Sequence, residues 1–140
     1  SGYSQGALVI HLAVGHGFLP GSEAIDLSRI AAISLIADPA RLSNAQEGLL
    51  GTAPPGHPGI WARAIEVAGH ISWAGSALYT PAIPSALASN LRTVTLCNEH
   101  DLVCDAWKDS NKTQHEGWRY TDLAKSAGAI AANKIDNAFP

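Results

Sequence analysis

A glycine–serine–glycine pattern at the start of the chain constrains its fold more than any other feature. Gly2-Tyr3-Ser4-Gln5-Gly6 has the form G-x-S-x-G, which is typical of a nucleophile elbow, a sharp turn between a buried strand and a helix. Because such a turn crowds the backbone, we expect both flanking positions to require a residue without a Cβ. The serine then lies at the apex, with its hydroxyl exposed and the N-terminus of the next helix beneath it.

The composition is that of one folded domain. The chain has 140 residues, of which 46% are hydrophobic and 15% charged, so it can bury a sizeable core and disorder is not expected. The formal net charge is −3 and no basic cluster is present, which argues against nucleic acid as a partner. No apolar run reaches the roughly 18 residues that a transmembrane helix needs.

A nucleophile elbow needs a strand in front of it, and only Ser1, Gly2 and Tyr3 precede the serine. We therefore expect these residues to be the C-terminal part of a domain whose N-terminal segment carries further strands of the same sheet. An export signal would lie upstream of the motif. The alternative is a self-contained fold of 140 residues.

Predicted strands and helices alternate along the chain, which is typical of a doubly wound α/β fold with a parallel sheet and helices on both faces. The helix predicted over 5–16 is apolar on most faces, as expected for a helix buried against a sheet. The apolar run 30–37 predicts a buried parallel strand. The other predicted elements are a loop over 41–59, a partly helical segment over 60–79, a short helix over 85–90, a strand over 92–96, a loop over 108–116 and a terminal helix over 118–135.

Three residues have the chain order of a hydrolytic triad. A serine is a weak nucleophile until a base takes its proton, and in α/β-hydrolases the serine is followed first by an acid and then by a histidine. Asp101 lies in a loop after the strand predicted over 92–96, as an orienting acid should, and His115 is the only histidine beyond it. The order rule therefore predicts Ser4 as nucleophile, Asp101 as acid and His115 as base.

Other aspartates compete with Asp101 for the role of the acid. Asp38 is the main rival because it also follows a predicted strand, although a turn-forming aspartate before Pro39 explains it equally well. Asp105 and Asp109 are weaker candidates because they lie farther from the end of a strand.

Two cysteines, Cys97 and Cys104, flank Asp101. A disulfide between them would close a short loop, fix the position of the carboxylate and indicate an oxidising compartment. Two unrelated free thiols are the alternative. We do not expect a zinc site, because no second pair of ligands has the required spacing.

The remaining histidines and a glycosylation sequon are assigned no catalytic role. His11 and His16 are expected to make local hydrogen bonds rather than bind a ligand. His57 lies in a proline- and glycine-rich loop with no carboxylate or cysteine at ligand spacing, which argues against a metal site. The sequon that begins at Asn111 lies close to His115, where a glycan would crowd the site, so we interpret it as coincidental.

The elbow, the acid between two cysteines and the histidine beyond them together resemble the cutinase family. That family is known for a G-Y-S-Q-G elbow and a C-x-x-x-D-x-x-C disulfide loop, which here runs from Cys97 to Cys104. The segment Ile36-Ala37-Asp38-Pro39 is similar to the family's strand ending in Gly-Asp-Pro, with alanine in place of the glycine. The resemblance runs in order through nearly the whole chain.

The resemblance implies a serine esterase, secreted or in the cell envelope, with a lidless α/β-hydrolase fold of which residues 1–140 form the C-terminal part. Such an enzyme hydrolyses carboxylic esters of lipid-like or polyester substrates through an acyl-enzyme and needs no metal or organic cofactor. We expect its partners to be an ester with an apolar acyl chain and the N-terminal segment of the same protein.

The resemblance also implies the residues of the site. The family's triad maps onto Ser4, Asp101 and His115 in this sequence. The oxyanion hole would use the backbone N–H of Gln5, together with a second donor from the segment upstream.

The stretch between the second strand and the acid loop looks longer than in compact cutinases, and an insertion or cap over about 56–79 accounts for the difference. The helical part of this insertion either packs against the domain or lines an apolar substrate cleft. Phage lysins that cleave mycolyl esters also carry extra helical segments there, so such an esterase is one alternative. An acyltransferase with the same triad, or a chain that is inactive without its upstream segment, are the others.

Overall fold

The fold is built on a parallel sheet of four short strands in the order β1-β2-β6-β3. The computed structural model of the chain describes residues 1–17, 24–68, 72–73, 76–77 and 79–138. The strands of the sheet are β1 (Gly2–Tyr3), β2 (Ile33–Ile36), β6 (Thr93–Leu96) and β3 (Gly48–Leu50). Every neighbouring pair of strands is parallel, which agrees with the α/β fold expected from the sequence.

The four strands end in one row across the sheet. Tyr3 pairs with Ile36, Ile36 with Leu96, and Leu50 with Leu96. The hydrogen bonding continues one residue further, because the N–H of Ser4 donates to the carbonyl of Ile36 at 2.8 Å. The loops that follow these strands therefore all start at the same edge of the sheet, where open α/β sheets place their functional residues.

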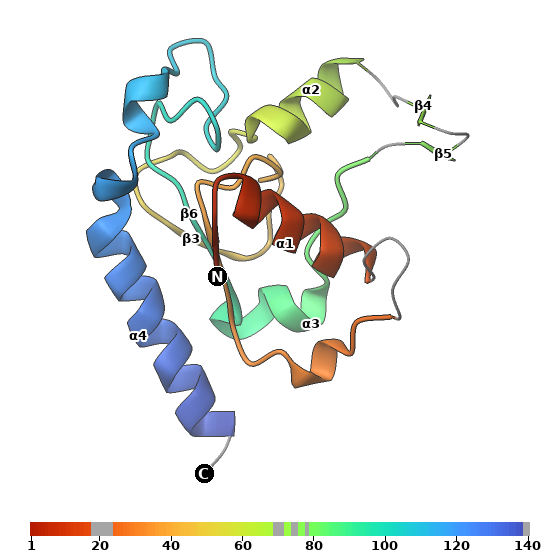
Figure 1. Cartoon of the computed structure of the whole chain (residues 1–140), viewed down its shortest axis with the longest axis vertical. Coiled ribbons are helices and arrows are strands. Elements are labelled where there is room, and N and C mark those ends of the chain that lie inside the picture. Colours follow the sequence, from red (N-terminus) through yellow and green to blue (C-terminus); the bar gives the residue numbers. More distant parts are fainter. Residues whose placement is uncertain (18–23, 69–71, 74–75, 78, 139–140) are drawn as a thin grey trace.

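Helices cover both faces of the sheet, as the doubly wound prediction requires (Figure 1). On one face, α1 (Gln5–His16) and α3 (Ser85–Ala88) enclose a core that includes Ile33 and Leu35 of β2. On the other face, α4 (Thr121–Ala138) packs over Leu96 and its neighbours. The alternation of side chains along a strand explains how the four residues of β2 serve both cores.

Helix α1 has the bounds predicted from its sequence and ends at Gly17, whose backbone is left-handed with φ 74° and whose N–H donates to the carbonyl of Val14. The expected burial is only partly observed. Ala7 is fully buried, but Val9 is 58% exposed. Among the described residues, the sheet covers one side of this helix and leaves apolar surface on the other.

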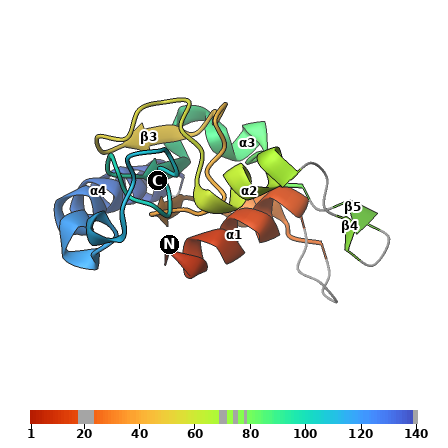
Figure 2. The ribbon, with the colours of Figure 1, turned by 90° about the horizontal axis from the view of Figure 1, so that it is seen from above.

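The segment after the second strand differs most from the prediction. Residues 41–59, predicted as a loop, contain strand β3, which is too short to show an alternating pattern. Helix α2 (Ile60–Ala68) is followed by the strands β4 (Ser72–Trp73) and β5 (Ser76–Ala77), which pair with each other away from the main sheet (Figure 2). Several residues of the predicted 56–79 insertion lie outside the described residues.

Other differences are small. Strand β2 occupies only four residues in the middle of the predicted 30–37 run, and the terminal helix α4 is preceded by a 3₁₀ turn. The short 3₁₀ turns are η1 (Leu27–Arg29), η2 (Ser89–Leu91), η3 (Lys112–Gln114) and η4 (Gly117–Tyr120). None of the helices described is both long and apolar enough to cross a membrane.

The two glycines of the elbow do not have equal roles. A Cβ on Gly2 would lie 2.5 Å from the backbone carbonyl of Gly6, which no side chain can accommodate. A Cβ on Gly6 would meet no described atom within 4 Å. The expectation that both positions require glycine is therefore wrong for Gly6, because this residue already lies in the first turn of α1 and points away from the crowded turn.

We predict that Gly2→Ala lowers the free energy of unfolding by roughly 1–3 kcal/mol, because the added methyl group forces the elbow backbone apart. Gly6→Ala is its matched control and should leave stability unchanged or raise it by up to about 1 kcal/mol, because alanine favours the helix. Urea unfolding of both variants measures the difference. Equal destabilisation by the two substitutions would contradict this account of the elbow.

Candidate active site

Ser4 lies between β1 and α1, at the apex of the elbow. Its backbone has φ 54° and ψ −119°, a conformation that is rare for a residue with a side chain. Two backbone hydrogen bonds hold it there. The N–H of Ser4 donates to the carbonyl of Ile36, which extends the parallel pairing of β1 with β2. The N–H of Leu8 donates to the carbonyl of Ser4, which forms the first turn of α1. The hydroxyl Oγ lies 2.9 Å from Nε2 of His115.

His115 connects this serine to the acid loop. Its Nδ1 lies 3.1 Å from both carboxylate oxygens of Asp101. Because a carboxylate only accepts hydrogen bonds, Nδ1 carries a proton, and Nε2 of the neutral ring is then free to accept the proton of Ser4. The three predicted residues are therefore brought into one hydrogen-bonded chain, although 111 positions separate the serine from the histidine.

Asp101 is completely buried, and each of its carboxylate oxygens has a further donor. The N–H of Val103 donates to Oδ1 at 2.8 Å, and the hydroxyl of Tyr120 donates to Oδ2 at 2.5 Å. Burial raises the pKa of Tyr120, and the hydrogen bond to Asp101 raises it further, so the phenol stays protonated and remains a donor. These contacts fix the carboxylate in the orientation that faces His115.

Two tyrosines that the sequence did not identify as site residues support the histidine and the acid. The ring of Tyr3 is stacked on the ring of His115, with centroids 5.2 Å apart and planes 14° apart. The hydroxyl of Tyr3 donates to the backbone carbonyl of His115. Tyr120 lies within the terminal helix predicted over 118–135 and was assigned no role in the site. The available signal was the general rule that a buried tyrosine hydroxyl needs a hydrogen-bond partner.

Cys97 and Cys104 form a disulfide, with their Cα atoms 5.9 Å apart. The alternative of two free thiols is therefore wrong. The bond closes the loop that contains Asp101, and the N–H of Cys97 donates to Leu50, so the loop is tied directly to the end of β3.

The three rival acids lie outside the hydrogen-bonded chain of Ser4, His115 and Asp101. Asp38 is buried and pairs with His11, and Asp105 is buried and pairs with His57. Asp109 is exposed in the loop before His115. Both histidine pairs join residues that are far apart in the sequence, so the expectation of a local hydrogen bond for His11 is wrong.

An apolar cavity of about 390 Å³ opens beside Ser4. Helix α2 contributes part of its wall, so this helix lies next to Ser4 as well as packing on the domain. The residues that line the cavity are Ser4, Gln5, Leu8, Pro39, Ile60, Trp61, Ala64 and Val103. Gln5 is the first residue of α1, and the first amide groups of a helix have no acceptor within that helix.

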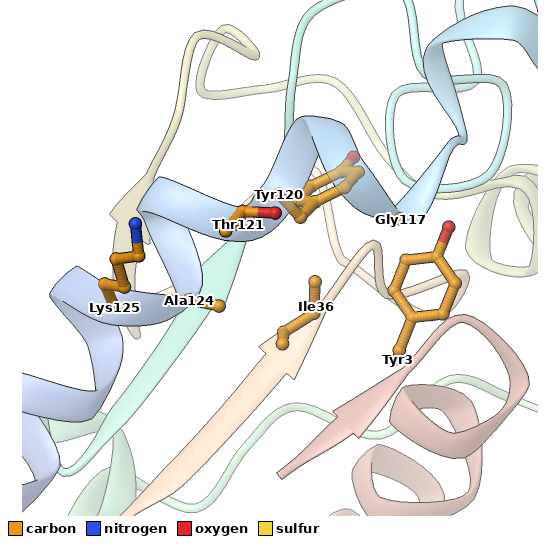
Figure 3. A pocket seen from close by; sticks show the side chains of 7 residues that line it. All are labelled: Tyr3, Ile36, Gly117, Tyr120, Thr121, Ala124 and Lys125. Carbon is orange, nitrogen blue, oxygen red and sulfur yellow. The ribbon is translucent and has the colours of Figure 1, made fainter.

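A second apolar cavity, of about 550 Å³, lies on the other side of Tyr3, between the ends of β1 and β2 and helix α4 (Figure 3). Ser4 does not line it. Its walls are formed by Tyr3, Ile36, Gly117, Tyr120, Thr121, Ala124 and Lys125. Across the described part of the chain, no group of three His, Cys, Asp or Glu side chains is placed to hold a metal ion.

Comparison with protein families matches residues 1–135 to Cutinase. The chain belongs to the cutinase family. Family membership implies a serine esterase, and the Cys97–Cys104 disulfide is consistent with a location outside the cytoplasm. Comparisons with curated proteins and with solved structures gave no match.

The chain departs from the cutinase pattern at Ala37, where the backbone is left-handed. The family's Gly-Asp-Pro is Ala37-Asp38-Pro39 in this chain. Ala37 has φ 51°, in the left-handed region that favours glycine, and its methyl group is fully buried. The alanine therefore adopts the backbone conformation that explains the family's glycine, and its N–H still donates to the carbonyl of Leu96.

The aspartate of this cutinase motif is half of a buried ion pair. Nδ1 of His11 lies 2.5 Å from Oδ2 of Asp38, and Nε2 lies 2.9 Å from the carbonyl of Pro81. Because both partners accept, both ring nitrogens donate, which is the charged form of the ring. Burial lowers the pKa of His11, but the hydrogen bond and charge of Asp38, with smaller effects of Pro81 and Glu47, outweigh it and raise the pKa above its usual value.

We predict that this pair makes stability pH-dependent. Because folding raises the pKa of His11, the charged histidine stabilises the fold fully at pH values below its unfolded-state pKa of about 6.5. This stabilisation is lost as the pH rises through the pKa of the folded state. Below that range, His11→Gln should lower the free energy of unfolding by roughly 3 kcal/mol, since it leaves Asp38 buried without its partner. Urea unfolding at pH 5.5 and pH 9 measures this, and an identical loss at both values would contradict it.

Proposed function

We propose that the protein is a serine esterase that hydrolyses carboxylic esters through an acyl-enzyme, with Ser4, His115 and Asp101 as its triad. The observation that carries the proposal is the hydrogen-bonded chain from the serine Oγ to Nε2 of His115 at 2.9 Å, and from Nδ1 to the carboxylate at 3.1 Å. Membership of the cutinase family supports the same reaction class.

The proposed mechanism follows from which atoms of Ser4, His115 and Asp101 carry a proton. His115 accepts the proton of Ser4 through Nε2 while Oγ attacks the ester carbonyl. Asp101 holds the ring in the correct tautomer and stabilises the imidazolium that forms. The imidazolium then protonates the leaving alcohol, and water attacks the acyl-enzyme by the same route. In this mechanism the backbone N–H of Gln5, at the start of α1, stabilises the tetrahedral oxyanion.

The cavity beside Ser4 supports an ester with an apolar acyl chain as substrate. Its volume of about 390 Å³ and its lining by Leu8, Ile60 and Trp61 suit hydrocarbon rather than a charged group. Lipid-like esters and polyesters both present such a chain next to the scissile carbonyl. The disulfide supports a secreted or cell-envelope location, where thiols are oxidised.

The direct test is the hydrolysis of p-nitrophenyl butyrate by Ser4→Ala. We expect kcat to fall by at least about 10³-fold, because the nucleophile is removed while binding and the oxyanion hole remain. Ser126→Ala, which changes an exposed serine on α4, is the matched control and should keep full activity. Full activity of Ser4→Ala would refute the proposal, and formation of a new ester in the presence of an added alcohol would identify an acyltransferase instead.

A further inference from the structure

A histidine–aspartate pair that the proposed triad does not use, His57 with Asp105, lies next to the acid loop. Asp105 directly follows the disulfide cysteine Cys104 and is only 1% exposed. Its Oδ1 lies 2.7 Å from Nδ1 of His57, and its Oδ2 accepts the N–H of His100 at 2.7 Å. The pair therefore joins the loop over 51–59 to the turn that precedes the catalytic acid.

That turn has a strained backbone next to Asp101. His100, immediately before the acid, has φ 65°, in the left-handed region that side chains with a Cβ rarely adopt. Such a conformation persists only where the surroundings hold it. Asp105 closes the turn from both sides, because its carboxylate accepts the N–H of His100 and its own N–H donates to the carbonyl of Asp101 at 2.7 Å.

Ring stacking and a neighbouring backbone hydrogen bond hold His57 in position. Its ring is stacked on the ring of Trp107, with centroids 4.5 Å apart and planes 9° apart, and the guanidinium of Arg63 lies 5.3 Å from the centre of the indole. Pro58, the next residue, accepts the N–H of Ala106 at 2.9 Å. The histidine can therefore fix the position of the Asp105 carboxylate rather than follow it.

A buried arginine holds the same two loops together beside this pair. The guanidinium of Arg41, which is 1% exposed, donates to the carbonyl of Pro54 at 2.6 Å and to the carbonyl of Cys104 at 3.2 Å. Because Arg41 already fastens the loops, the His57–Asp105 pair is not needed merely to keep them in contact. Its distinctive contact is the one with the strained residue His100.

We propose that the His57–Asp105 pair positions the catalytic acid by holding His100 in its left-handed conformation. The carboxylate of Asp101 then faces Nδ1 of His115 with little freedom to turn. His57 and Asp105 act through Asp101 and touch neither the substrate nor the reacting atoms. The inference rests on the proposed esterase function, in which Asp101 is the acid of the triad.

The test compares Asp105→Ala in two backgrounds. In the natural background we expect kcat for p-nitrophenyl butyrate to fall by about 10–100-fold with KM changed by less than about twofold, since a misplaced acid slows the chemical step rather than binding. Glycine accepts a positive φ without strain. In a His100→Gly background, the loss caused by Asp105→Ala should therefore shrink to less than about threefold.

His100→Ala is the matched control for the glycine. It removes the same imidazole, which is 48% exposed, but keeps the Cβ that causes the strain, so it should not rescue Asp105→Ala. His57→Phe keeps an aromatic ring on Trp107 without the Nδ1 donor, and we expect it to lower kcat in the same direction and to be rescued by His100→Gly. This variant replaces Asp105→Ala if the latter does not fold.

A readout independent of activity is the downfield proton NMR signal of Nδ1–H in His115, which reports its hydrogen bond to Asp101. We expect this signal to weaken in Asp105→Ala and to return in the double variant with His100→Gly. A signal and a kcat unchanged by Asp105→Ala would overturn the inference, as would equal losses in both backgrounds. If the natural protein hydrolyses no ester, the proposed function fails, while the NMR signal still decides the positioning role.

Discussion

The site depends on the register of the parallel sheet. Because Tyr3, Ile36, Leu96 and Leu50 lie in one row, the loops after all four strands begin side by side. The elbow serine and the acid loop, which are about a hundred positions apart in the sequence, therefore meet at one edge. A shift of one residue in any strand would turn its side chains to the opposite face and move the loop that follows it.

Three of the five non-glycine residues with positive φ among the described residues lie at this edge. Ser4, Ala37 and His100 have positive φ values although none is a glycine, and they lie in the segments that leave β1, β2 and β6. Such conformations cost free energy and require support from their surroundings. The support comes from the sheet for the serine and the alanine, and from the disulfide-closed loop and Asp105 for the histidine. Loops without regular structure, held by these contacts, thus carry the residues proposed for catalysis.

Local signals in the sequence predicted much of this arrangement. The elbow and its helix were predicted with the observed bounds, because a glycine–serine pattern and an apolar run can both be recognised within a short stretch of sequence. Strand β3 was missed because three residues are too few to show a period, and its stability comes from pairing with β6. The partners of His11 and His57 could not be predicted, since they lie 27 and 48 positions away and only the folded chain brings them together. The role of Gly6 was misjudged because a motif does not show which atoms surround each glycine.

Reaction with diethyl p-nitrophenyl phosphate, followed by mass spectrometry of the labelled peptide, tests the central claim most directly. This organophosphate reacts much faster with a serine that a neighbouring base activates than with other hydroxyl groups. If His115 activates Ser4 as their 2.9 Å contact indicates, one phosphoryl group should attach per chain, on Ser4, in step with the loss of ester hydrolysis. Ester hydrolysis that continues without a label on Ser4, or a label on a different residue, would contradict the account.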